Sequence, residues 1–123
     1  MPLTRPISAI HDATPRARSV LIDLQGAAFP FKPGQAIWVG THGQSLRRPY
    51  SIAVSPEDVV RSGMLELLVG VEADGDPGAH LRLSPGTMLD LDGPSGGFTF
   101  PDRPGEPRFL FIAGGTGIAP LRS

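Results

Sequence analysis

Short apolar runs separated by turn residues dominate the chain, and this pattern predicts a protein built mainly from β-strands. The 16 glycines and 14 prolines fall between these runs rather than in one tract. Many short strands joined by turns are typical of a small all-β barrel or sandwich. We expect strands within residues 4–11, 16–24, 36–39, 47–53, 65–71 and 88–92, and loops at residues 25–30 and 55–63.

The last of these strands alternates strictly between apolar and acidic residues. Leu89 and Leu91 alternate with Asp90 and Asp92. Two carboxylates on one face could imitate a catalytic pair, but the same alternation is typical of a barrel strand with one solvated face. We therefore interpret the two aspartates as the solvated side of a barrel strand.

One segment has the signature of a helix start. Asp76 offers a capping side chain, Pro77 suits the first turn, and leucines follow at helical spacing. Pro85 and Gly86 then end the pattern after about two turns. The sequence therefore predicts one short helix here.

The end of the chain has a different pattern. Residues 109–113 form a continuous apolar run, which predicts a strand buried on both faces, as in parallel sheets. Residues 114–120 then predict a glycine turn and a helix, the opening of a nucleotide-binding βαβ unit. We expect a barrel domain at residues 1–100, a linker at 101–107 and a truncated α/β domain at 108–123.

Composition excludes several classes of function. The 11 basic and 12 acidic residues do not provide the basic face that nucleic-acid binding normally shows. Without cysteine the chain holds no disulfide, thiolate metal site or iron–sulfur cluster. No apolar run resembles a signal peptide or a membrane span, so we expect a cytoplasmic protein with no membrane partner.

Candidate chemistry is concentrated in Arg48-Pro49-Tyr50-Ser51. A guanidinium, an aromatic face and a hydroxyl within four residues suit a flat ring system that carries a phosphate. Pro49 cannot donate to a β-ladder, which places this strand at an edge or a strand end. In isolation the same residues would also fit the half-solvated face of a sheet. The preceding Arg47 could assist Arg48, but we interpret it as solvated.

Other residues are weaker candidates. His11, His42 and His80 lack metal-ligand spacing, so we interpret them as surface residues and expect no metal site. Phe98 and Phe100 could contact an adenine, but aromatic residues more often close the end of a barrel.

The order of these segments resembles the flavin-binding half of the ferredoxin–NADP reductase superfamily. The resemblance rests on residues 31–35, 48–51, 68–71, 75–81, 93–98 and 114–120, which extend across nearly the whole chain. It implies a six-stranded antiparallel Greek-key barrel with one short helix, followed by a nicotinamide-nucleotide domain. The cofactor implied is FAD, or less often FMN.

The resemblance also implies a role for each matching residue. Arg48 would bind the flavin phosphate, Tyr50 would stack on the isoalloxazine and Ser51 would hydrogen-bond near flavin N5. The short helix would direct its first amides at the pyrophosphate, because a helix N-terminus favours an anion. The other residues implied in cofactor binding are Pro49, Val69, Gly70, Val71, Gly75, Gly78, Ala79, His80 and Thr116, and those implied in NAD(P) binding are Gly115, Thr116, Gly117 and Pro120.

Two departures from the family pattern matter for the cofactor. Family members usually carry Ser or Thr where this chain has Gly78, so one phosphate contact is missing. Asp76 lies at the same predicted helix start, where its carboxylate would cap the amides and repel a phosphate. FMN therefore stays open as an alternative to FAD.

The implied activity is hydride transfer from NAD(P)H to the flavin, followed by electron delivery to an iron–sulfur or haem partner, such as a small redox protein. Residues 108–123 supply only the first strand and turn of a nicotinamide domain, so we expect no tight NAD(P)H binding by this chain. Two alternatives remain open at this stage: a flavin-free interaction module, and an electron-transfer subunit of a larger complex.

Overall fold

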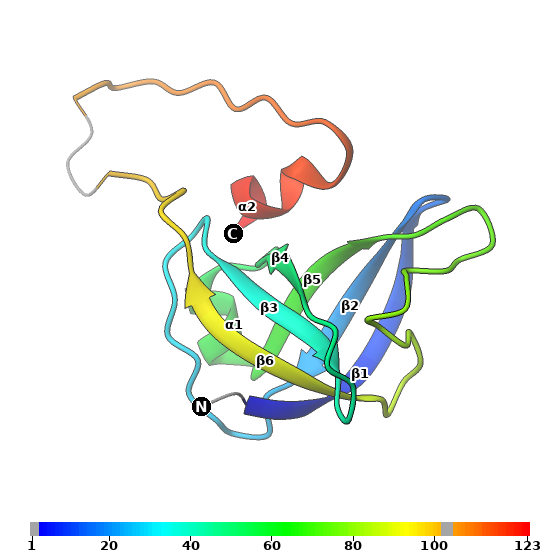
Figure 1. Cartoon of the computed structure of the whole chain (residues 1–123). Coiled ribbons are helices and arrows are strands. Elements are labelled where there is room, and N and C mark those ends of the chain that lie inside the picture. Colours follow the sequence, from blue (N-terminus) through cyan, green and yellow to red (C-terminus); the bar gives the residue numbers. More distant parts are fainter. Residues whose placement is uncertain (1–2, 102–104) are drawn as a thin grey trace.

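In a computed structural model, which describes residues 3–101 and 105–123, six antiparallel strands curl into a barrel (Figure 1). The strands are neighbours in the order β4-β3-β6-β1-β2-β5, and each neighbouring pair is antiparallel. This arrangement confirms the predicted all-β, six-stranded antiparallel fold. The bounds are β1 Leu3–Thr14, β2 Ala17–Asp23, β3 Ala36–Thr41, β4 Arg48–Ser51, β5 Met64–Gly70 and β6 Met88–Ser95.

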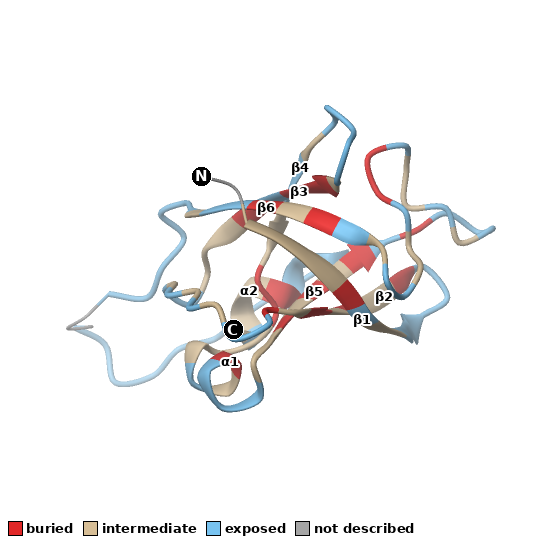
Figure 2. Cartoon of the chain, turned by 90° about the horizontal axis from the view of Figure 1, so that it is seen from below, coloured by how far each residue is buried: buried red, intermediate tan, exposed pale blue. Residues whose placement is uncertain are grey.

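The barrel interior is a single apolar core contributed by alternate residues of the strands. Figure 2 shows these buried positions in red along the strands. In β6 the side chains of Leu89 and Leu91 are buried, whereas Asp90 is half-buried and Asp92 is exposed. The sequence-based interpretation of that alternation is therefore correct.

The two edge strands, β4 and β5, meet only over a short length. An isolated bridge joins Ile52 to Leu67, and the Ala53 amide donates to the Glu66 carbonyl at 2.9 Å. β4 itself lies before this bridge and pairs only with β3. The barrel is thus incompletely closed beside β4, and we call this part of the wall the seam.

The helix between β4 and β5 lies in a segment where the sequence predicted a loop. This is helix α1, Pro56–Ser62. The Asp58 amide donates to the capping Ser55 hydroxyl at 3.1 Å, and Gly63 ends the helix in the left-handed region at φ 71°. A serine followed by proline and two acidic residues was the available signal.

The helix predicted from Asp76 does not form. Instead the Asp76 carboxylate accepts a hydrogen bond from the Gly78 amide at 2.9 Å, and Gly78 adopts φ +110°. Asp76 therefore closes a local turn, which competes with helix formation. The Gly78 amide, which was expected to face a phosphate from a helix N-terminus, is thus bonded to Asp76.

The predicted strand at residues 109–113 is also wrong. These residues are extended but form no strand, and Leu110 and Ile112 are each 85% exposed. A strand needs a hydrogen-bonded neighbour, and in the described parts of the chain no segment pairs with this one. Figure 1 shows the segment arching over the barrel in orange.

The predicted turn and helix that follow are present. A 3-10 turn, η1 Gly115–Gly117, leads into helix α2, Ile118–Arg122. α2 rests on the barrel through buried Ala119, an Arg122–Glu66 ion pair and a 3.0 Å bond from the Ser123 hydroxyl to the Val54 carbonyl. The predicted linker, 101–107, includes residues 102–104, which lie outside the described residues. No helix in the described ranges is long and apolar enough to cross a membrane.

Candidate functional site

Two predicted ligand-binding residues of strand β4, Arg48 and Tyr50, lie on the face of the strand that is turned toward the barrel interior. Arg48 lies opposite Val39 and Tyr50 opposite Ile37 in the β3–β4 register, and both β3 residues are fully buried. Residues directly opposite in an antiparallel pair share a face. Ser51 alternates to the other face, as the sequence predicted.

A groove of about 480 Å³ lies beside Arg48. It brings together four residues predicted to bind the cofactor, from three separate segments: Arg48, Gly70, Val71 and Gly78. Arg16, which the sequence analysis did not single out, adds a second guanidinium. Arg48 is exposed, and no ion pair ties it to another described residue. Its charge is therefore available to an anionic ligand.

The remaining predicted residues are distributed around this groove. Thr116 approaches it, because a Cβ built on Gly70 would lie 3.9 Å from the Thr116 methyl group. Val69 points into the core and Ala79 is exposed. The predicted NAD(P)-binding residues are divided between two hollows: Gly115 and Thr116 line one with Arg16, whereas Pro120 lines another with Phe98.

His80 is the main site residue whose environment was predicted wrongly. It is only 2% exposed, not a surface residue, and its Nε2 lies 2.5 Å from the Tyr50 hydroxyl. Burial raises the pKa of Tyr50, opposed by the charge of Arg48. Burial and then Arg48 lower the pKa of His80, opposed by Asp76. The neutral form of His80 is therefore favoured.

This environment predicts an acid-dependent loss of stability. Below its ordinary pKa of about 6.5, His80 takes up a proton more readily in the unfolded chain than in the folded one. Unfolding is then favoured by up to about 1.4 kcal/mol for each pH unit until the folded pKa is reached. We expect urea unfolding to show a smaller loss between about pH 7.5 and 5.5 in His80→Gln than in wild type. Equal losses in the two proteins would contradict this.

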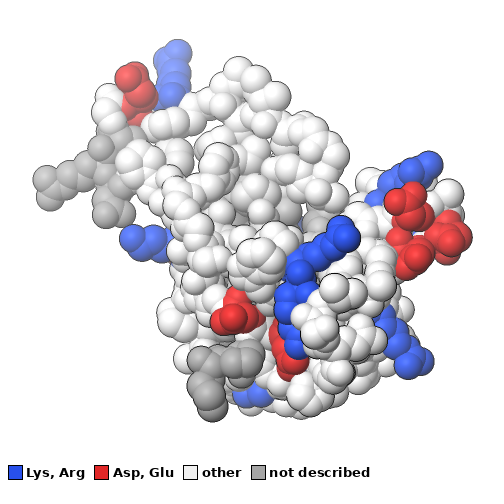
Figure 3. Space-filling view, in the orientation of Figure 1, with Lys and Arg blue, Asp and Glu red and all other residues white. Residues whose placement is uncertain are grey.

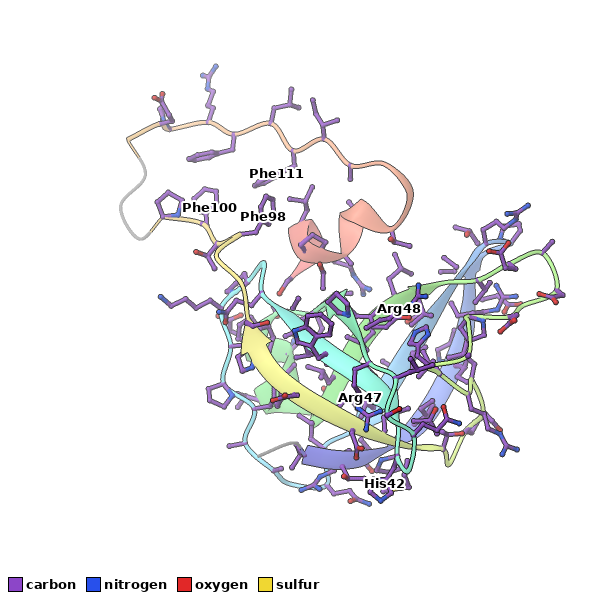
Figure 4. The ribbon with its side chains drawn as sticks, in the orientation of Figure 1. His42, Arg47, Arg48, Phe98, Phe100 and Phe111 are labelled. Carbon is purple, nitrogen blue, oxygen red and sulfur yellow. The ribbon has the colours of Figure 1, made fainter. Side chains whose placement is uncertain are left out.

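Arg47, interpreted as solvated, is instead held on the outer face of the barrel. Its guanidinium pairs with the Asp90 carboxylate at 2.5 Å, and His42 Nδ1 approaches the same carboxylate at 2.8 Å. Thr4 donates to Asp90 as well, at 2.7 Å. Although burial opposes it, these hydrogen bonds and charges together lower the Asp90 pKa. Figure 4 shows Arg48 nearer the arching segment and Arg47 nearer His42, and of the two only Arg48 lines the groove.

The phenylalanines predicted to close the barrel end do not do so. Phe98 and Phe100 are 66% and 47% exposed, and Phe100 packs edge-on against Phe109 at 4.5 Å between ring centres. Figure 4 shows Phe98, Phe100 and Phe111 gathered between the arching segment and the barrel.

The charged side chains on the face shown in Figure 3 are scattered in small groups of mixed sign. The described residues contain no group of histidine and acidic side chains that could hold a metal ion.

The comparisons with known proteins agree with this geometry. The family described as "Oxidoreductase FAD-binding domain" matches residues 8–100. Ferredoxin--NADP reductase B from Sorangium cellulosum is 36% identical, covering 99% of this chain and 50% of that protein. The NADPH oxidoreductase of Mycobacterium tuberculosis is 35% identical, covering 80% of this chain but 27% of that protein.

A solved structure extends the likeness to three dimensions. The Amycolatopsis cytochrome P450 reductase GcoB superposes with a TM-score of 0.79 at 29% identity, covering 99% of this chain and 37% of that one. The chain therefore belongs to the oxidoreductase FAD-binding domain family, and its fold is that of the ferredoxin reductase FAD-binding barrel. It spans half or less of the length of these relatives.

The residues beside the seam fit FAD in part. An unpaired Arg48, a second guanidinium from Arg16 and the side-chain-free edges of Gly70 and Gly78 suit a phosphate and a close backbone approach. Glu72 and Asp76 line the same groove and disfavour additional negative charge. Cationic and acidic residues therefore line the same groove, which fits a phosphate only in part.

Proposed function

We propose that this chain is the flavin-holding part of an NAD(P)H-dependent oxidoreductase that passes electrons to an iron–sulfur or haem partner. The observation that carries the proposal is Arg48, which forms no ion pair with another described residue and lines a groove with Gly70 and Gly78. Arg48 lies two residues before Tyr50 on the same face of β4. The names of the relatives, a ferredoxin reductase, an NADPH oxidoreductase and a cytochrome P450 reductase, support the electron-transfer role.

Each side chain then has a specific task. Arg48 binds the flavin phosphate by a charge-assisted hydrogen bond, and Tyr50 offers its ring for stacking. Ser51 would hydrogen-bond near flavin N5, and the backbone at Val69, Gly70 and Val71 would line the rest of the cofactor. Bound flavin supplies the redox chemistry itself, so the protein has only to orient the ring and control its exposure to water.

For the nicotinamide cofactor we propose a division of labour. Residues 1–100 form the flavin domain, 101–107 a linker, and 108–123 the first segment of an NAD(P)-binding domain. Gly115, Thr116, Gly117 and Pro120 would contact NAD(P) only together with the rest of such a domain. Calorimetric titration of the 123-residue chain should accordingly reveal no tight NAD(P)H binding.

The visible absorption spectrum of the purified chain, followed by chromatography of the cofactor released by heat, tests the proposal directly. We expect a flavin band and FAD in the supernatant, from the native chain or after reconstitution. Released FMN would show that only the ring and first phosphate are held. A colourless chain that takes up no added flavin would favour a flavin-free interaction module instead.

A further inference from the structure

We propose that His80 is a positioning residue for the flavin, because its bond to the Tyr50 hydroxyl fixes the position of the outer end of the Tyr50 ring at the seam. The inference rests on the proposed function of the groove and assigns it an additional residue. His80 comes from the loop after β5, whereas Tyr50 lies on β4. The contact therefore spans the incompletely closed part of the barrel wall.

The contact joins the hydroxyl end of Tyr50 to the edge of the His80 ring, and we call this hydrogen-bonded pair the clamp. The Tyr50 hydroxyl and His80 Nε2 are 2.5 Å apart, while the two ring centres are 5.8 Å apart. The hydroxyl lies at the outer end of the tyrosine ring, so the ring centres are well separated although the two bonded atoms are close. His80 therefore meets Tyr50 at its hydroxyl end, with 19° between the ring planes, and the bond itself does not occupy a face of the Tyr50 ring.

The clamp is anchored on its histidine side. His80 is 2% exposed, and its carbonyl accepts a hydrogen bond from the Thr41 amide at 2.9 Å. The adjacent Leu81 is buried in the core and its amide donates to the Gly78 carbonyl at 3.3 Å. Tyr50 itself is only half-buried on an edge strand, so the histidine is the more rigid partner.

The other ring nitrogen defines the direction of the bond. His80 Nδ1 is buried without a hydrogen-bond partner and faces Gly78, where an added Cβ would lie only 3.1 Å away. A buried N–H without a partner is rarer than a buried acceptor without one, which favours the proton on Nε2. Nε2 then donates to the Tyr50 oxygen. The phenolic hydrogen of Tyr50 remains available to donate to the cofactor.

Two charged groups of opposite sign, Arg48 and Asp76, act on His80. Arg48 from β4 disfavours a positive imidazole, and Asp76 from the same loop as His80 favours it. Burial, and then Arg48, lower the pKa of His80 and so favour the neutral ring, which has a single N–H donor. The residue at position 78 is linked to this arrangement, because a larger side chain there would press on Nδ1.

The test uses the full chain with His80→Phe, which keeps an aromatic ring without the donor, and His80→Gln, which keeps a donor. His11→Gln, at an exposed histidine on β1, is the matched control. FAD affinity is measured by quenching of flavin fluorescence. Ionisation of Tyr50 is measured separately in the cofactor-free chain by phenolate absorbance, because Tyr50 is the only tyrosine.

We expect His80→Phe to weaken FAD binding about tenfold and to raise the Tyr50 pKa further, because the phenolate loses a hydrogen-bond donor. His80→Gln should stay within about threefold of wild type and His11→Gln should match it. Unchanged affinity and tyrosine titration in His80→Phe, or equal losses in both His80 variants, would overturn the inference. If the wild-type chain bound no FAD at all, the proposed function would fail first.

Discussion

Removing both Arg48 and Tyr50 should leave the protein unable to retain its flavin. The double variant Arg48→Ala, Tyr50→Ala loses a charge-assisted phosphate contact of about 1.5–3 kcal/mol and an aromatic contact of about 0.5–1.5 kcal/mol. Together these correspond to a loss of affinity of roughly 30-fold to 2,000-fold. Equilibrium dialysis against FAD measures it, and the purified variant should be colourless.

The control for this variant removes an arginine and an aromatic side chain elsewhere. Arg61 on α1 and Phe109 on the arching segment do not line the groove. The variant Arg61→Ala, Phe109→Ala should therefore bind FAD as wild type does. Far-ultraviolet circular dichroism shows whether both variants keep their strands. A folded Arg48→Ala, Tyr50→Ala protein that stayed yellow would refute the assignment of β4.

The second large effect concerns stability. Leu67 is 1% exposed and pairs with Ile52 in the bridge that closes the barrel. Leu67→Ala would leave a cavity and should lower the free energy of unfolding by about 2–5 kcal/mol. A small domain has a total stability of only about 5–15 kcal/mol, so the urea midpoint should fall markedly.

Leu110→Ala is the matched control for this change. Leu110 is 85% exposed, so the same substitution there removes almost no buried surface. We expect its urea midpoint to lie close to that of the wild-type chain. Equal destabilisation by the two substitutions would mean that residues 109–113 are packed in solution, as the sequence pattern first indicated.

The strands could be predicted because each carries its own local signal. Alternation in β6 and the β-branched run in β2 specify strand and buried face without reference to the remainder of the chain. The cation, ring and hydroxyl of β4 were recognisable for the same reason. Glycine and proline then marked most of the turns correctly.

The errors arose where a local signal had two outcomes. Asp76 can cap a helix or close a turn, and Gly78 at φ +110° belongs to the turn. A lone histidine is usually exposed, and only the fold reveals that His80 lies beside Tyr50, 30 residues earlier in the chain. The apolar residues 109–113 predict a buried strand, but burial depends on a neighbouring strand that the described chain does not supply.

Pro49 affects how the edge strand β4 can pair with a strand of another chain. It lies in the middle of the edge strand β4, opposite the exposed Trp38. An edge strand is a template on which another chain can add its own strand, with aggregation as the result. Proline has no N–H to offer such an intruder and so interrupts the template. The incompletely closed barrel wall beside β4 is thereby protected from pairing with the edge strand of another chain.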